Sequence, residues 1–246
     1  QEGKPVVVVQ GLGFVGGVMS LVCANAISTE YAVIGVDLPT TNSLWKIRSF
    51  NAGVLPLKSS DPKVSEYFER AKDKGNHYAT FDPYAYEHAD VVIVDVNLDV
   101  QKESGIQGEL DGFDVNIEPF AKAIADIAEN CKPDVLVVVE TTVPPGTCQQ
   151  IVLPILKRGL ADRNLPTDSF RLGHSYERVM PGPNYIDSIQ NFHRVFSGID
   201  DASAEATEKF LKTIIRTDEY PLTRLQGTNA TEIAKVLENA YRATNI

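Results

Sequence analysis

The chain has 246 residues, of which 43% are hydrophobic, enough to bury a sizeable core in one large α/β domain or in one domain with part of a second. Its formal net charge of -10 and its pI of about 4.9 disfavour partners such as nucleic acid or anionic membranes, whose binding depends on Lys and Arg.

No apolar run reaches the roughly 18 residues of a membrane span, and the first residues lack the pattern of a signal peptide. We therefore expect a cytoplasmic protein with no membrane partner. The three widely spaced cysteines and the four scattered histidines predict neither a disulfide framework nor a metal site.

Short apolar runs alternate with longer stretches of helical periodicity along most of the chain. This alternation is typical of βαβ units, and continuous runs of Val and Ile indicate parallel strands that are covered on both faces. We therefore expect an α/β fold with a doubly wound, mostly parallel Rossmann-type sheet. The predicted strands are 5–10, 32–37, 91–96, 135–140, 170–172 and 194–198. The predicted helices are 14–27, 62–74, 115–130, 147–158 and 202–215.

Three local signals refine these elements. Asp61 followed by Pro62 predicts an N-cap with proline at the first helical position. Pro154 lies inside a helical pattern and predicts a kink or a shortened helix. The polar, glycine-containing segment 97–113 predicts a long loop above the end of a strand.

The organisation changes near residue 226, where a strand-like segment gives way to a closing helical pattern. Asn229 is the predicted N-cap of this helix, and Glu232 follows three residues later, as in a capping box. Lys235 and Asn239 lie four residues apart on one face of it. Another face is apolar at helical spacing and contains Ile233, Val236, Leu237, Ala240 and Tyr241.

The clearest motif is GLGFVG, which follows the first apolar strand and opens a helix. Gly11 permits the tight turn, Gly13 lets the backbone approach a pyrophosphate, and Gly16 lets the helix pack closely on the strand. The N-terminus of the helix then offers N–H groups to the phosphates. We expect Phe14 and Val15, in the same turn, to line the cofactor.

The second predicted strand ends in Asp37, about 20 residues after the glycine motif, where a dinucleotide fold places the carboxylate that binds a ribose 2′-hydroxyl. That carboxylate should repel a 2′-phosphate. The nearest basic residues, Lys46 and Arg48, lie several positions later, so the pattern favours NAD over NADP. A glycine turn and an aspartate without any ligand is the less favoured alternative.

Two further segments, ETTVPPGT and HSYERVMPGPNY, follow predicted strands, where open α/β sheets bind their ligands. Taken alone, ETTVPPGT could be an ordinary strand–turn–helix junction, and the Glu–Arg pair of HSYERVMPGPNY could be a solvated salt bridge. Together with Lys235 and Asn239, their Thr142 and Glu177 supply groups that suit acyl chemistry, in which an oxyanion needs donors and a water needs activation. No cysteine or serine stands in an evident nucleophile setting, and we expect Cys148 to be structural.

The segments GLGFVG, TTVPPGT, ERVMPG and KVLENAYRATNI, together with Asp37, resemble the UDP-glucose/GDP-mannose dehydrogenase family of nucleotide-sugar dehydrogenases. By this resemblance the chain comprises the NAD-binding Rossmann domain, 1–226, and the start of a central dimerisation helix, 227–246. It implies oxidation of the C6 alcohol of a UDP-sugar, of the UDP-N-acetyl-hexosamine or UDP-glucose type, to the uronate. The family uses two NAD and no metal, as homodimers or larger assemblies, in polysaccharide-precursor synthesis.

The resemblance also implies roles for single residues. Thr142 would position a water and Glu177 would assist proton transfer when a thioester on the family's cysteine is hydrolysed, and both would lie beside NAD. Lys235 and Asn239 would stabilise oxyanions at the sugar carbon. We find no counterpart of the family's cysteine loop or nucleotide-sugar-binding domain, so we expect this chain to bind NAD without completing the oxidation. DVNLDV stands where the family often has Val-Pro-Thr-Pro, which leaves the nicotinamide-side contacts open.

Two alternatives remain at this point. One is a β-hydroxyacid dehydrogenase relative, which also joins a Rossmann domain to a helical domain and uses a lysine, but would not need Glu177. The other is a noncatalytic NAD-binding module that ends naturally at Ile246.

Overall fold

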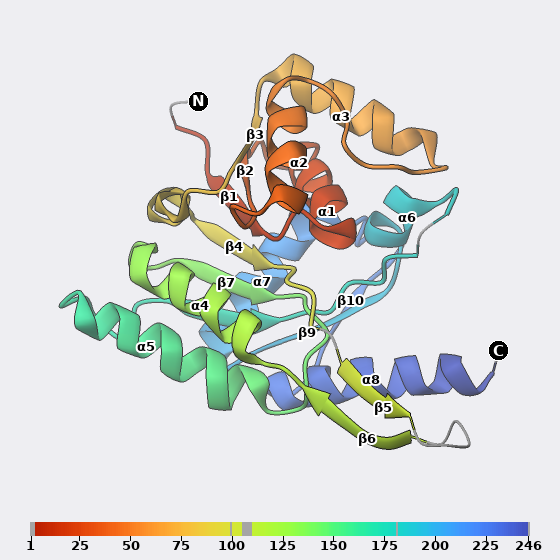
Figure 1. Ribbon diagram of the computed structural model, residues 1–246. Helices are drawn as coiled ribbons and strands as arrows, with labels where there is room; N and C mark the ends of the chain where they lie inside the picture. The colour runs from red at the N-terminus through yellow and green to blue at the C-terminus, as the bar shows by residue number, and fades with distance from the viewer. Residues whose placement is uncertain (1–2, 99, 105–109, 181, 246) are drawn as a thin grey trace.

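The computed structural model describes residues 3–98, 100–104, 110–180 and 182–245. Figure 1 shows a twisted central sheet with helices on both faces. The strand order is β10-β9-β8-β7-β4-β1-β2-β3, and the neighbours are parallel except for β8 and β9. The order reverses between β1 and β4, which is the switch point where a doubly wound sheet binds its ligand. The expected Rossmann-type fold is therefore confirmed.

The strands of the sheet are β1 (Val6–Gln10), β2 (Ala32–Val36), β3 (His77–Thr80), β4 (Val91–Val94), β7 (Leu136–Val139), β8 (Arg171–His174), β9 (Arg194–Gly198) and β10 (Leu222–Arg224). The helices are α1 (Phe14–Ala24), α2 (Thr41–Asn51), α3 (Pro62–Lys74), α4 (Glu118–Asn130), α5 (Leu153–Asp162), α6 (Tyr185–Gln190), α7 (Asp201–Ile214) and α8 (Thr228–Thr244). A 3-10 turn, η1 (Pro83–His88), and a π-helical turn, η2 (Cys148–Val152), complete the list. Each predicted strand and helix is present within a few residues of its predicted bounds.

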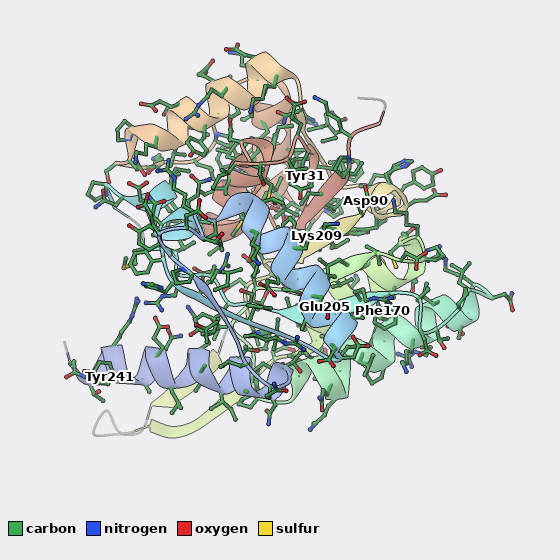
Figure 2. The ribbon with its side chains drawn as sticks, turned by 180° about the vertical axis from the view of Figure 1, so that it is seen from behind. Tyr31, Asp90, Phe170, Glu205, Lys209 and Tyr241 are labelled. Atoms are coloured by element: carbon green, nitrogen blue, oxygen red, sulfur yellow. The ribbon has the colours of Figure 1, made fainter. Side chains whose placement is uncertain are left out.

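Two hydrophobic layers form because successive side chains of a strand point to opposite faces of the sheet. Val7 and Val9 of β1 pack into the layer under α1, α3, α6 and α7, whereas Val8 packs into the layer under η1, α4 and α5. Figure 2 shows the reverse face, where α7 crosses the sheet with Glu205 and Lys209 on its outer side. Burial on both faces explains why β1, β4 and β7 are continuous runs of Val and Ile.

Two of the local signals are confirmed. The Asp61 side chain accepts a hydrogen bond from the Lys63 backbone N–H at 2.9 Å, and Pro62 occupies the first position of α3. Near Pro154, the chain forms the π-helical turn η2 before α5 begins at Leu153. Proline then lies in the first turn of α5, where its missing N–H needs no partner.

Other expectations are wrong. The segment 97–113 is not simply a loop, because β5 (Val100–Ser104) pairs with β6 (Leu110–Val115) in an antiparallel two-stranded sheet (Figure 1). Residues 99 and 105–109 of this segment lie outside the described residues. The helices α2 and α6 and the strand β3 were not predicted. Gly227, with φ of 76°, precedes α8 in place of the predicted cap Asn229.

The face of α8 that packs against the protein is polar. Thr228, Thr231, Glu232 and Lys235 are buried on it, beside β8, β9 and η2. Its apolar side chains Ile233, Val236, Leu237 and Tyr241 are exposed. Among the described helices, none combines the length and the apolar character needed to cross a bilayer.

Candidate NAD-binding and catalytic site

The glycine turn between β1 and α1 has the geometry that its sequence predicts. Gly11 has φ of 95°, and a Cβ atom there would lie 2.6 Å from the Asp95 carbonyl oxygen. A Cβ atom on Gly16 would lie 1.9 Å from the Gly11 carbonyl oxygen, so only glycine allows this close approach. Around Gly13 a Cβ atom would meet no atom within 4 Å. The turn is thus open at Gly13, where a pyrophosphate would approach the helix N-terminus.

Asp37 lies beside this turn. Its Oδ2 accepts a hydrogen bond from the Leu12 N–H at 3.3 Å, and its Oδ1 accepts one from the Leu38 N–H at 2.8 Å. The sequence expectation that basic residues stay distant is wrong for Lys46, whose Nζ is 3.2 Å from Asp37 Oδ2 and also donates to the Leu12 carbonyl. The unpredicted helix α2 brings Lys46 back to the strand end, so its cation offsets part of the carboxylate's charge.

A cavity of about 420 Å³ runs along the carboxyl ends of the strands. At one end it is lined by Gly11, Gly13, Phe14, Val15, Asp37 and Lys46. At the other end it is lined by Gln10, Asp95, Glu140, Thr141, Thr142 and Glu177. Except for Gly16, which packs beneath the turn, each predicted cofactor residue therefore lines one continuous cavity. A glycine cradle, a strand-ending carboxylate and an open helix N-terminus fit a dinucleotide.

Thr142 lies in the ETTVPPGT turn between β7 and η2, and a residue of α8 holds this turn in place. The buried carboxylate of Glu232 accepts the Gly146 N–H at 2.5 Å and the Cys148 N–H at 2.8 Å. Glu232 therefore caps η2, where orphan N–H groups favour a negative charge, instead of capping its own helix. These hydrogen bonds join α8 to the turn that carries Thr142. Lys235 lies about one helical turn after Glu232 on α8.

Glu177 lines the second end of the cavity, and Lys235 contacts Glu177 from α8. Lys235 Nζ lies 3.8 Å from Glu177 Oε1, donates to the Glu177 carbonyl at 2.9 Å and lies 5.1 Å from the centre of the Tyr176 ring. The other Glu177 oxygen accepts the Val179 N–H. Burial lowers the pKa of Lys235, and the neighbouring Glu177 opposes this shift.

The loop that carries Glu177 is also tied to the glycine turn. The Tyr185 hydroxyl donates to the Phe14 carbonyl at 2.5 Å, and the two rings stack with centroids 4.8 Å apart. The Met180 N–H donates to Ser188 Oγ of α6 at 3.1 Å. Pro181 of the ERVMPG segment lies outside the described residues.

Asn239 is a predicted site residue that does not line the cavity. It is exposed on α8, one turn beyond Lys235 and on the same side of the helix. Lys235 is also not among the cavity-lining residues and reaches the site through Glu177.

A buried ionic cluster that was not predicted from the sequence lies at the end of the cavity that Glu177 lines. Arg194 Nη2 lies 2.7 Å from Glu140 Oε1, and both side chains are buried. Burial raises the pKa of Glu140 to about 6, against the opposing effect of Arg194. Burial, with the nearby Glu140 and Glu177, also raises the pKa of Asp95 well above its ordinary value. In the sequence, the only indication of this cluster is that Asp95 and Glu140 stand near the ends of the apolar strands predicted at 91–96 and 135–140.

The cysteines are all buried and unpaired, which agrees with a structural role for Cys148. In the part of the chain that the structure describes, no group of three or more His, Cys, Asp or Glu side chains could hold a metal ion.

Residues 5–215 match the model of the NAD binding domain of the UDP-glucose/GDP-mannose dehydrogenase family. A UDP-N-acetyl-D-mannosamine dehydrogenase of Pyrococcus horikoshii is 27% identical over 242 residues, which cover 98% of this chain and 51% of the relative. A UDP-N-acetyl-D-glucosamine 6-dehydrogenase of Pseudomonas aeruginosa is 25% identical over 240 residues, covering 98% and 50%. The chain thus spans about half the length of the curated relatives it matches.

Among solved structures, an NDP-N-acetyl-D-galactosaminuronic acid dehydrogenase from Methanosarcina mazei Go1 superposes with a TM-score of 0.82 at 25% identity, over 97% of this chain and 47% of that one. A diketoreductase, at 15% identity and a TM-score of 0.51, shares the fold alone. The matches favour a nucleotide-sugar dehydrogenase over the β-hydroxyacid alternative. The chain belongs to the UDP-glucose/GDP-mannose dehydrogenase family, of which it carries the NAD-binding domain.

Proposed function

We propose that the complete protein oxidises the C6 alcohol of a UDP-linked N-acetyl-hexosamine to the carboxylate in two NAD-dependent steps. The observation that carries this proposal is the convergence of Thr142, Glu177 and Lys235 beside one end of the dinucleotide cavity. Curated relatives named for UDP-N-acetyl-D-mannosamine and UDP-N-acetyl-D-glucosamine support the substrate class.

Bound NAD supplies the hydride acceptor, and the residues of this chain supply orientation and charge. The Lys235 ammonium, buried and held by the Glu177 carbonyl, is suited to donate to an oxyanion that develops on the sugar carbon. Asn239, on the same side of α8, would add a second donor once the sugar reaches that helix. In this proposal Glu177 takes up a proton from a water that Thr142 would orient.

We also propose that the complete protein is cytoplasmic and forms a homodimer or a larger assembly. The exposed apolar side chains Ile233, Val236, Leu237 and Tyr241 of α8 support the assembly, because exposed apolar strips mark surfaces that another chain covers. It also includes the division of the chain into an NAD-binding domain, 1–226, and the start of a central helix, 227–246.

The test is a panel of nucleotide sugars offered to the protein encoded by the complete gene. NADH formation from a UDP-N-acetyl-hexosamine, with two NADH per sugar, is the expected result. Glu177→Gln should lower kcat roughly 100-fold or more while leaving NAD affinity within about twofold, because a group that moves protons in the reaction is lost. The matched control Glu205→Gln, exposed on α7, should retain kcat.

Three results would contradict the proposal. NADH formation from none of the sugars would favour a noncatalytic NAD-binding module. Turnover of a small hydroxy acid by the Glu177→Gln variant would favour the β-hydroxyacid alternative. Preference for UDP-glucose would overturn the substrate class alone.

A further inference from the structure

Two acidic side chains line the cavity where the neighbouring strands β4 and β7 end. Asp95 follows β4, and its N–H donates to the Gln10 carbonyl at 2.9 Å. Glu140 follows β7, and its N–H donates to the Val94 carbonyl at 3.1 Å. The cation of Arg194 pairs with Glu140 Oε1 and also donates to the carbonyls of Ser175 and Tyr176. Arg194 thus forms its ion pair with Glu140, and its charge also opposes, without cancelling, the rise that burial causes in the pKa of Asp95.

Three acceptor atoms at this end of the cavity lack a partner. Asp95 Oδ2, Glu140 Oε2 and Gln10 Oε1 are buried and form no hydrogen bond within the described residues. Their residues all line the cavity. Buried polar groups without partners are uncommon in native proteins, so three together point to a donor or a positive charge that arrives from outside the chain.

The position of these atoms identifies which part of the dinucleotide they face. A doubly wound sheet binds one nucleotide over each half, with the pyrophosphate at the switch point between β1 and β4. Asp37, at the end of β2, marks the half for the adenosine ribose. The other half, over β4 and β7, takes the nicotinamide nucleotide, and Asp95 and Glu140 lie there.

The nicotinamide ring carries a positive charge in NAD⁺ and none in NADH. We propose that Asp95 and Glu140 share one proton before the cofactor binds and release it to solvent when the charged ring of NAD⁺ enters, so that this protein selects NAD⁺ over NADH. The net charge of the site is unchanged, because one proton leaves as one positive ring charge arrives. No covalent bond to the cofactor forms. NADH, with a neutral ring, leaves the proton in place.

The surrounding charges agree with a shared proton. Burial raises the pKa of both Asp95 and Glu140, and the negative charges of Glu140 and Glu177 raise the pKa of Asp95 further. The Arg194 cation opposes both shifts. The titratable and charged groups facing the pair are Cys23 of α1, Glu177 of the loop after β8, Tyr185 of α6, Arg194 of β9 and Lys235 of α8. The two cations among them are already paired, Arg194 with Glu140 and Lys235 with Glu177. Asp95 is therefore the carboxylate most readily kept neutral.

This inference rests on NAD binding alone, and under the proposed function it gains a use. Each sugar needs two NAD⁺ in succession, so the NADH from the first step must leave before the second can begin. A cluster that binds the charged ring more tightly than the neutral one favours that exchange.

The test is calorimetry on this chain at pH 7 in two buffers of different ionisation enthalpy, phosphate and Tris. NAD⁺ should release about 0.5–1 proton on binding, whereas NADH and ADP-ribose, which lacks the ring, should release close to none. In Asp95→Asn the release should vanish and the ratio of NAD⁺ to NADH affinity should fall about tenfold. Asp90→Asn, at the opposite end of β4, is the matched control and should keep both values.

Glu140→Gln provides a second arm if Asp95→Asn does not fold, and it should also reduce the release. Equal release with NAD⁺ and ADP-ribose, or release unchanged in the folded Asp95→Asn variant, would overturn the proposal. NAD⁺ binding without proton release would overturn it while leaving NAD binding intact. Loss of sugar oxidation in the complete protein, with the proton release retained, would count against the proposed function only.

Discussion

Glu232 should be among the most destabilising positions to change in this chain. Its side chain is 0% exposed and accepts N–H groups from Gly146 and Cys148 at 2.5 and 2.8 Å. Hydrogen bonds to a charged group contribute about 1.5–3 kcal/mol each, and no water can replace an acceptor in this buried place. Glu232→Ala, which strands both N–H groups and leaves a cavity, should lower the free energy of unfolding by roughly 3–5 kcal/mol.

Glu232→Gln separates the two contacts. The amide keeps one acceptor oxygen but turns an NH₂ group toward the second N–H, so the loss should be about 2–3 kcal/mol. Urea denaturation followed by circular dichroism measures both values, with Glu205→Ala and Glu205→Gln on the exposed side of α7 as controls near zero. A Glu232→Ala loss below about 1 kcal/mol, or one equal to its Glu205 control, would refute the idea that α8 caps η2.

The remaining predictions concern cofactor choice and acid stability. Asp37→Asn should weaken NAD binding about tenfold and reduce the preference for NAD over NADP, because one charge-assisted contact to the ribose is lost. Lys46→Met should increase that preference; calorimetry tests both, and tighter binding of NADP by the wild type would contradict the role given to Asp37. Burial lowers the pKa of His174 to about 3, so the folded state resists a proton that the unfolded chain takes up below about pH 6.5. His174 should therefore make stability fall as pH drops from 6.5 toward 3, by roughly 1.4 kcal/mol per pH unit. Burial lowers the pKa of His77 to about 4, so His77 adds a slope of its own. In urea melts, His174→Gln should lose the His174 part of the slope, whereas exposed His88→Gln should keep all of it.

Most of the fold could be predicted from the sequence because its signals are local. The Val-rich runs of β1, β4 and β7 need no partner to be recognised, and the glycine motif sits between a strand and a helix as the chemistry requires. The α2 helix lacked an N-cap hydrogen bond and a strong apolar stripe, so its sequence gave little helical signal.

The parts that could not be predicted depend on contacts between distant segments. Nothing in the spacing of Glu140 and Arg194 reveals that strand order brings them together. A capping box is a local pattern, so the sequence predicts that Glu232 caps its own helix. In the structure Glu232 instead accepts hydrogen bonds from a turn in another part of the chain. The buried face of α8 is polar, and its apolar stripe is exposed, so periodicity alone does not show which face of this helix packs against the sheet.

The contact between Tyr185 and Phe14 has a consequence for motion at the site. Its hydroxyl bond and stacked rings fasten the short helix α6 to the turn that receives the pyrophosphate. The loop bearing Glu177 ends at this same helix, and the Met180 N–H is anchored there through Ser188. The glycine turn and the loop that carries Glu177 are therefore both fastened to α6, so the position of the carboxylate is fixed relative to the turn at the other end of the cavity.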